Sequence, residues 1–239
     1  MAYLTIVFDL DGTLVDTAPD LIDTLNVVLA HEGLPAVDYA TARNMIGGGA
    51  RRMIESGLRF EGRAFSGSDV DRMFSDFIAH YSAHIADRSR VFPGLAEALD
   101  HLADRNCRLA VCTNKLEQLS RQLLDALGLA PRFAAICGQD TFGIQKPDPE
   151  ILHRTIQAAG GELRRAVMIG DSGTDIATAR AADIPVVAVD FGYSETPIAT
   201  LRPDRLISHF DELIGAIQEV APDFSGTAAE LSRKSHFKP

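Results

Sequence analysis

The sequence is poor in lysine and cysteine, and it has no basic excess and no long apolar run. Its 33 acidic residues outnumber its 23 lysines and arginines, so the formal net charge is −10. Because nucleic acids and anionic membrane surfaces bind basic faces, this charge argues against both as partners. No apolar run is long enough to span a membrane, and the N-terminus MAYLTIVFDL lacks the basic lead of a signal peptide.

The three cysteines, Cys107, Cys112 and Cys137, form no CxxC pair, and we expect all three to be reduced. Reduced cysteines favour a cytoplasmic setting, which we therefore predict. The 239 residues suit one large domain or a domain with a smaller insert, and 46% apolar residues are enough for a real core. The sequence leaves open whether the protein is a monomer or a homodimer.

The hydrophobic pattern divides the chain into a core and an insert. The run YLTIVFDL predicts a buried first strand, and residues 16–88 then show helical periodicity with no clear strand. Thr17 and Asp20 resemble a capping box at the start of this helical segment, and Asp16 is another candidate cap. From residue 89 to about residue 222, strand and helix patterns alternate, as they do in a parallel sheet covered by helices.

We therefore expect an α/β fold with a doubly wound, Rossmann-like parallel sheet. Residues 1–15 and 89–222 form this core, residues 16–88 form a helical cap inserted after the first strand, and residues 223–239 form a loosely held tail. An insert at the carboxyl end of a core strand lies over the place where such sheets bind ligands.

Polar residues end several segments of the predicted core. Four motifs carry them: DLDGT with Asp9 and Asp11, TNK with Thr113 and Asn114, KP with Lys146, and GDSGTD with Asp171 and Asp175. Because the carboxyl ends of parallel strands share one edge, we expect these side chains to converge. Carboxylates that lie so close together repel one another, and Mg²⁺ together with a lysine relieves the repulsion. Mg²⁺ favours phosphate oxygens, so the pattern predicts phosphoryl chemistry.

A carboxylate at such a site can attack phosphorus and form an aspartyl phosphate. A second carboxylate two residues later can protonate the leaving alkoxide and then activate water. Thr113 and Asn114 offer a hydroxyl and an amide to phosphate oxygens, and Lys146 supplies a fixed positive charge. Lys115 could join this site, but we expect it to be an exposed lysine in the first turn of a helix.

The order DLDGTLVD, TN, KP and GDSGTD resembles the haloacid dehalogenase superfamily of phosphohydrolases, and the helical insert resembles the first cap class of that superfamily. The resemblance covers residues 9 to 175 and implies Mg²⁺ as the cofactor. It also implies these roles: nucleophile for Asp9, general acid/base for Asp11, phosphate binding for Thr113 and Asn114, charge stabilisation for Lys146, and a Mg²⁺ site formed by Asp9, Asp11 and Asp171, with Asp175 serving the metal shell or anchoring Lys146.

The insert bears on which ester is hydrolysed. Its segments DTAPDLIDTLN and IGGGARRMIESGL most resemble the branch of the superfamily that hydrolyses 2-phosphoglycolate. This resemblance implies a small anionic phosphate ester as substrate, with Gly48, Gly49 and Arg51 reading its carboxylate at a helix N-terminus. The alternative interpretation of GGGARR is a helix–helix turn followed by solvated arginines.

Other functions on the same core stay open. The chain could hydrolyse a sugar phosphate, or it could be a phosphoryl mutase similar to β-phosphoglucomutase. Relatives of the mutase type hold a second phosphate with cap lysines or arginines, and residues 15–88 contain Arg51 and Arg52 but no lysine. The missing lysine also argues against carbon–phosphorus bond cleavage, and Asp11 argues against the dehalogenase and transport ATPase branches. A non-catalytic regulator, with all four motifs as relics, is the last alternative.

Overall fold

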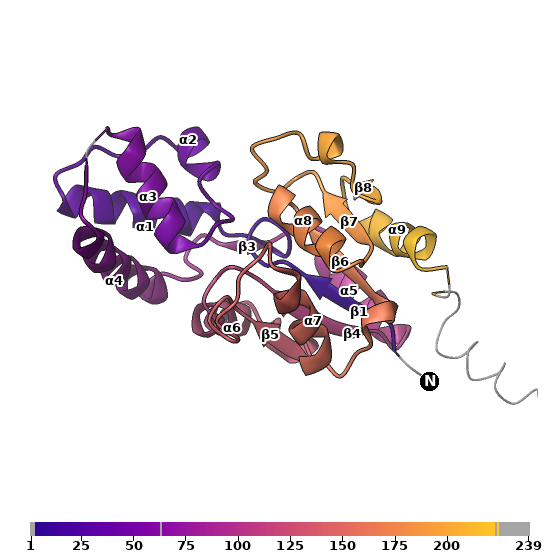
Figure 1. The fold of residues 1–239 in the computed structure, drawn as a ribbon. Helices are drawn as coiled ribbons and strands as arrows, with labels where there is room; N and C mark the ends of the chain where they lie inside the picture. Colours follow the sequence, from indigo (N-terminus) through magenta and orange to yellow (C-terminus); the bar gives the residue numbers. More distant parts are fainter. Residues whose placement is uncertain (1–2, 63, 223, 225–239) are drawn as a thin grey trace, which may run out of the picture.

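The computed structural model describes residues 3–62, 64–222 and 224. The predicted tail at 223–239 lies outside these residues except for Phe224, which is buried. Among the described residues, no helix combines the length and the apolar character that crossing a membrane requires. An open sheet carries helices on both faces, and a separate group of helices lies at one end of the molecule (Figure 1).

In the described part of the chain, the main sheet has six strands: β1 (Thr5–Phe8), β4 (Arg108–Cys112), β5 (Ala135–Cys137), β6 (Ala166–Gly170), β7 (Val186–Val189) and β8 (Arg205–Ile207). All neighbouring strands are parallel, in the order β5-β4-β1-β6-β7-β8, which confirms the predicted fold class. Phe8 is level with Val111 and Ile169. The residues that follow β1, β4 and β6 therefore leave the sheet at the same edge.

Buried side chains alternate between the two faces of the sheet. Ile6 and Phe8 belong to one apolar core, and Val7 belongs to the other. The first core is covered by α5 (Leu95–Asp104), α6 (Glu117–Ala126) and α9 (Leu213–Val220), and the second by α7 (Pro149–Ala158) and α8 (Gly173–Ala181). Because the central strands are buried on both faces, their sequences are nearly continuous apolar runs. Short 3-10 turns complete this part: Ala130–Arg132, Leu163–Arg165, Ile198–Leu201 and Phe210–Glu212.

A separate group of helices, which we call the cap helices, is drawn in indigo to purple at the left of Figure 1. The cap helices are α1 (Ala18–His31), α2 (Tyr39–Arg43), α3 (Ala50–Phe60) and α4 (Gly67–Ala83). Leu25, Met53 and Phe77 are almost fully buried in their shared core. The buried side chains of α4, Val70, Met73, Phe77 and Tyr81, follow the helical periodicity predicted for residues 16–88 and lie on one face of the helix.

The two crossings between the cap helices and the sheet lie side by side. β2 (Val15–Asp16) pairs antiparallel with β3 (Arg90–Val91), and Val15 is level with Val91. The sequence predicted no strand there, because two residues are too few to show a periodicity. This pairing joins the beginning and the end of the inserted segment.

The capping box predicted at the start of α1 is wrong. Thr17 is the N-cap residue, but its side chain makes no capping hydrogen bond; its hydroxyl donates to Asp11 Oδ1 at 2.8 Å instead. The Asp20 carboxylate accepts hydrogen bonds from the backbone N–H groups of Arg88 and Ser89 and from the Ser89 hydroxyl. The Asp20 side chain therefore holds a distant segment, and the Thr17 side chain bonds back to the turn after β1, so neither closes a helical turn.

Candidate active site

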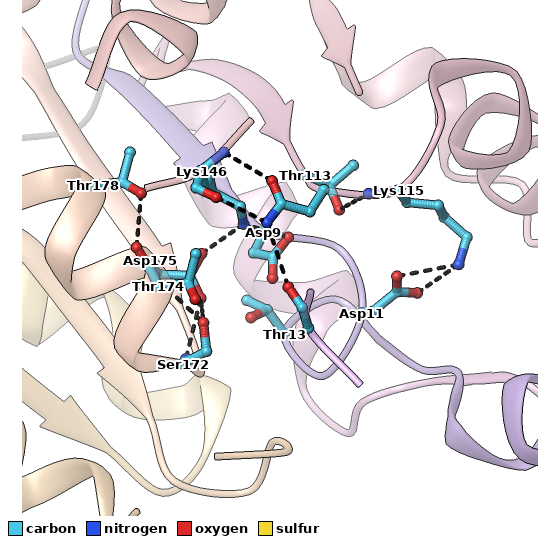
Figure 2. Close-up of polar contacts among 12 residues, drawn as sticks. Asp9, Asp11, Thr13, Thr113, Lys115, Lys146, Ser172, Thr174, Asp175 and Thr178 are labelled. Atoms are coloured by element: carbon cyan, nitrogen blue, oxygen red, sulfur yellow. Dashed lines mark hydrogen bonds and ion pairs between the residues drawn. The ribbon is translucent and has the colours of Figure 1, made fainter. Parts of the chain in front are cut away.

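Lys146 lies between two carboxylates at the carboxyl edge of the sheet (Figure 2). Its Nζ atom is 2.8 Å from Asp9 Oδ1 and 2.6 Å from Asp175 Oδ1, and all three side chains are buried. Burial disfavours the ammonium form, but Asp175 and Asp9 outweigh this effect and hold the pKa of Lys146 above its ordinary value. The lysine is therefore charged and offsets part of the repulsion between its two partners.

Asp171 adds a third carboxylate at the end of β6. One oxygen each of Asp9, Asp171 and Asp175 lies within 4.8 Å of the others; we call these residues the carboxylate cluster. Burial raises the pKa of Asp9 to about 6, although Lys146 opposes the shift. Burial, with the charges of Asp175 and Asp9, raises the pKa of Asp171 well above its ordinary value. Three carboxylates facing one ammonium retain negative charge, so the donor set fits a hard cation such as Mg²⁺.

The loop after β7 and the turn after β1 hold Asp171 in place. The Tyr193 N–H donates to Asp171 Oδ2 at 2.6 Å, and the Thr13 hydroxyl donates to Oδ1 at 3.2 Å. A Cβ atom on Gly192 would lie 2.2 Å from the Asp171 Cβ, and one on Gly12, which has a φ of 83°, would lie 2.4 Å from Oδ2. Only glycine leaves room for the carboxylate at these two positions.

Tyr193 also joins this loop to the start of α1. Its hydroxyl donates to Asp16 Oδ1 at 2.6 Å and accepts from the Ala18 N–H at 2.9 Å. The expectation that Asp16 caps α1 is therefore wrong, because Thr17 is the N-cap and Asp16 bonds to the tyrosine. The sequence pattern did not reveal Tyr193; the only available signal was its place just after a strand of the parallel sheet.

Asp175 has a second role at the start of α8. Its Oδ2 atom accepts from the Ser172 hydroxyl at 2.6 Å and from the Ser172 N–H at 3.1 Å, while its other oxygen contacts Lys146. The Ser172 hydroxyl in turn accepts from the Asp175 N–H, which completes a capping box. The helix cap therefore fixes the orientation of the carboxylate that anchors the lysine.

Thr113 and Asn114 follow β4 and lie beside these charges. The Asn114 Oδ1 atom accepts from the Lys146 N–H at 2.8 Å, and its amide donates to the Lys146 carbonyl at 3.2 Å. The Thr113 hydroxyl accepts from the Lys115 N–H at 3.2 Å, so its own proton remains available to a ligand. Asn114 thus positions the lysine loop, and Thr113 presents a donor at the predicted phosphate position.

Asp11 is not part of the carboxylate cluster. Both of its oxygens contact Lys115 Nζ, at 2.9 and 3.1 Å (Figure 2). Its Oδ1 atom also accepts a hydrogen bond from the Thr17 hydroxyl. Of the four predicted metal ligands, the structure therefore brings together the side chains of three and gives the fourth different partners. A carboxylate held apart from the others is suited to exchanging protons with a ligand.

The expectation that Lys115 is an exposed helix lysine is wrong. Lys115 is only 7% exposed. Its Nζ atom contacts Asp11 and lies 4.4 Å from the centre of the Tyr81 ring. Burial disfavours its charged form, but Asp11 holds the pKa of Lys115 above its ordinary value. Both partners lie far away in the sequence, so no local pattern could have revealed these contacts.

A narrow cavity lies between the sheet edge and the cap helices, and several of these groups line it. About 40 Å³ is open to the centres of water molecules, room for about three waters on the usual scale. The core contributes polar side chains to its wall, and the cap helices contribute mainly apolar ones. Its lining includes Asp9, Asp11, Thr113, Asn114, Lys115 and Gln139 from the core, and Gly49, Ala50, Phe74 and Tyr81 from the cap helices.

The glycine turn before α3 only partly reaches this cavity. Gly49 lines it, whereas Gly48 packs against the side chain of Arg52. The Arg51 guanidinium pairs with Asp71 at 2.5 Å, where both side chains are largely exposed, and it lies over the ring of Phe74. The structure therefore places Gly49 at the cavity, but it places Gly48 and the charge of Arg51 elsewhere.

Comparison with known proteins gives a consistent set of relatives. Residues 6–189 match the family model of haloacid dehalogenase-like hydrolases. The chain is 50% identical to a phosphoglycolate phosphatase of Mesorhizobium japonicum over 90% of its length and 94% of the relative, and 47% identical to one of Caulobacter vibrioides over 86% and 87%. A crystal structure from Haemophilus somnus, described as a predicted phosphoglycolate phosphatase, superposes with a TM-score of 0.85 at 28% identity, covering 90% of this chain and 98% of that one.

Proposed function

Because the chain belongs to the haloacid dehalogenase-like hydrolase family and is a phosphoric monoester hydrolase, we propose that it hydrolyses 2-phosphoglycolate with Mg²⁺ as its cofactor. One observation carries the proposal: Asp9 belongs both to the carboxylate cluster and to the wall of the cavity. A nucleophilic carboxylate has to reach the substrate and the ion at once. The names of the relatives support the choice of substrate.

In this proposal, residues 16–88 act as a cap over a core made of residues 1–15 and 89–222. The cavity between them is narrow, and the cap helices line it mainly with apolar side chains. Such a space suits a small ester better than a sugar phosphate, because a hexose would need several more polar partners than the cap helices present. A closed cap also excludes bulk water from the reacting groups.

The first step is attack by Asp9 on phosphorus. A bond forms between a carboxylate oxygen of Asp9 and phosphorus, while the bond from phosphorus to the ester oxygen breaks. Asp11 gives its proton to the departing glycolate oxygen, and Lys146 and Thr113 stabilise charge on the transferred phosphoryl group. Lys115 and Thr17 hold the Asp11 side chain where it can meet that oxygen.

The second step removes the phosphoryl group from Asp9. Asp11, now ionised, takes a proton from a water molecule, which attacks phosphorus and releases inorganic phosphate and free Asp9. Asp9, Asp171 and Asp175 would hold Mg²⁺, with Asp11 at the edge of that site. When bound, the ion would neutralise charge between these carboxylates and the phosphate oxygens.

The test is a panel of esters: 2-phosphoglycolate, ethyl phosphate and glucose 6-phosphate, each with Mg²⁺ and then with excess EDTA. We expect 2-phosphoglycolate to have the highest kcat/KM, EDTA to abolish turnover, and Asp9→Asn to be inactive. Product analysis on glucose 1-phosphate separates the alternatives: free phosphate indicates hydrolysis, and glucose 6-phosphate would indicate a mutase. Turnover that survives in EDTA or in Asp9→Asn would contradict the mechanism, and a preference for a sugar phosphate would contradict the substrate.

A further inference from the structure

The cavity wall carries few charges. Among the described residues that line it, the charged ones are Asp9, Asp11 and Lys115, so Lys115 is the one cation among them. A substrate with a second anionic group beyond its phosphoryl group has to place that group in the same narrow space. Burying a carboxylate without a cationic or hydrogen-bonding partner is strongly unfavourable. The structure therefore contains one obvious position for such a group.

Tyr81 marks the same position from the cap side. Its side chain is fully buried and lines the cavity, and its hydroxyl makes no hydrogen bond of standard geometry within the described residues, although the Lys115 ammonium lies near enough to lower its pKa. A buried hydroxyl without a partner is costly, so it points to a ligand that supplies one. Burial raises the pKa of Tyr81 to about 12, and the hydroxyl therefore stays protonated and can donate. Its ring packs against the Lys115 ammonium at 4.4 Å.

We propose that Lys115 from the core and Tyr81 from the cap form the subsite that binds the carboxylate of the substrate; this rests on the proposed function above. The lysine ammonium has three donor hydrogens, and it can bind a second carboxylate while keeping contact with Asp11. The tyrosine hydroxyl donates to the same carboxylate. Substrate binding then links the cap to the core, which keeps the cavity closed during turnover.

The same contacts connect recognition to chemistry. The Lys115 Nζ atom is 2.9 Å from Asp11 Oδ1. An ammonium held between Asp11 and the substrate carboxylate therefore places Asp11, the general acid, beside the glycolate end of the ester. Arg51, the residue that the sequence suggested for this task, is on the surface with Asp71. Lys115 is therefore a specificity-determining residue in this proposal, and Tyr81 is its partner.

The experiment compares ligands that differ only in the carboxylate. Substrates are 2-phosphoglycolate and ethyl phosphate, and competitive inhibitors are 3-phosphonopropionate and propylphosphonate, measured against ethyl phosphate turnover. In Lys115→Met, we expect the preference for the carboxylate member of each pair to fall by at least about 30-fold. In Tyr81→Phe, which keeps the ring and removes only the hydroxyl, we expect it to fall by about tenfold.

Two control variants test whether the loss of preference is specific to Lys115 and Tyr81. Arg121→Met removes an exposed cation from α6, where it pairs with Glu117, and should leave both preferences unchanged. Arg51→Met tests the competing position and should also leave them unchanged. Circular dichroism and thermal unfolding check each fold, and Tyr81→Phe decides the question if Lys115→Met does not fold.

The outcomes are distinct. If the wild-type protein does not prefer 2-phosphoglycolate to ethyl phosphate, the proposed substrate is wrong, and the proposed subsite is wrong as well. In a second outcome, the wild type shows that preference while Lys115→Met and Tyr81→Phe slow the hydrolysis of both esters equally and keep the affinity ratio of 3-phosphonopropionate to propylphosphonate. That result would support the proposed substrate and refute the subsite. A preference lost in Arg51→Met alone would assign the carboxylate to that arginine instead.

Discussion

The Nζ atom of Lys146 lies 2.8 Å from the Oδ1 atom of Asp9, and both side chains are buried. Within the described residues this oxygen accepts no well-oriented hydrogen bond, so the contact is mainly electrostatic. The lysine is shared with Asp175, and its backbone is held by Asn114. A buried pair of this kind is most sensitive to the removal of one member, because the other is left charged in a poorly solvated place.

Replacing Lys146 by methionine should therefore lower the free energy of unfolding by about 3–5 kcal/mol. Methionine is similar in length to lysine, so the loss of stability comes mainly from leaving Asp9 and Asp175 without their cation. Urea unfolding at pH 7.5 in EDTA measures it, and turnover in Mg²⁺ should fall by at least about 100-fold. Arg154→Met removes a cation from an exposed pair with Glu150 and should unfold like the wild type. Equal stability of the two variants would contradict the prediction.

Magnesium should stabilise the protein through the carboxylate cluster. An ion that binds only the folded state raises the free energy of unfolding by about 2.7 kcal/mol at 100 times its Kd. Asp171→Asn removes one buried charge, and the pKa of Asp171 is raised by burial and by the neighbouring Asp175 and Asp9. We therefore expect this variant to be no less stable than the wild type in EDTA, but to lose most of the Mg²⁺-dependent gain. Thermal unfolding with increasing Mg²⁺ measures both effects; an undiminished gain in Asp171→Asn would place the ion elsewhere.

The fold and the position of the site could be predicted from local patterns. Apolar runs alternating with helical periodicity indicated a parallel sheet, and a parallel sheet brings residues such as Asp9 and Asp171 to one edge because each directly follows a strand. The burial of Lys115 was not predictable in this way. Its environment depends on Asp11, 104 residues earlier, and on a ring from the cap helices. The role of Tyr193 could not be predicted for the same reason, since the partners of its hydroxyl, Asp16 and Ala18, come from the beginning of the chain.

Gly192 should be intolerant of a side chain. A Cβ atom there would lie 2.2 Å from the Asp171 Cβ, and the neighbouring Tyr193 N–H would lose its 2.6 Å hydrogen bond to the carboxylate. We expect Gly192→Ala to lower the free energy of unfolding by about 1–3 kcal/mol and to weaken Mg²⁺ stabilisation. Gly215→Ala is the matched control, because nothing lies within 4 Å of its added Cβ inside α9. Alanine should stabilise that helix by about 0.5–1 kcal/mol. Urea unfolding compares the two, and a stabilised Gly192→Ala would show that the loop can move away.

Asp20 should contribute most to holding the start of α1 against residues 88–89, where the chain returns from the cap helices to the core. Its carboxylate is buried and accepts from the Arg88 N–H, the Ser89 N–H at 2.8 Å and the Ser89 hydroxyl at 2.6 Å. Asp20→Ala leaves two backbone donors without these partners, so we expect a loss of about 2–4 kcal/mol in the free energy of unfolding. Amide hydrogen exchange should also become faster at residues 88–91. Asp23→Ala removes an exposed carboxylate from the same helix, where its ion-pair partner among the described residues is the Arg88 side chain, and should change neither measurement. If both variants lose the same stability, surface charge rather than the buried carboxylate holds the crossings together.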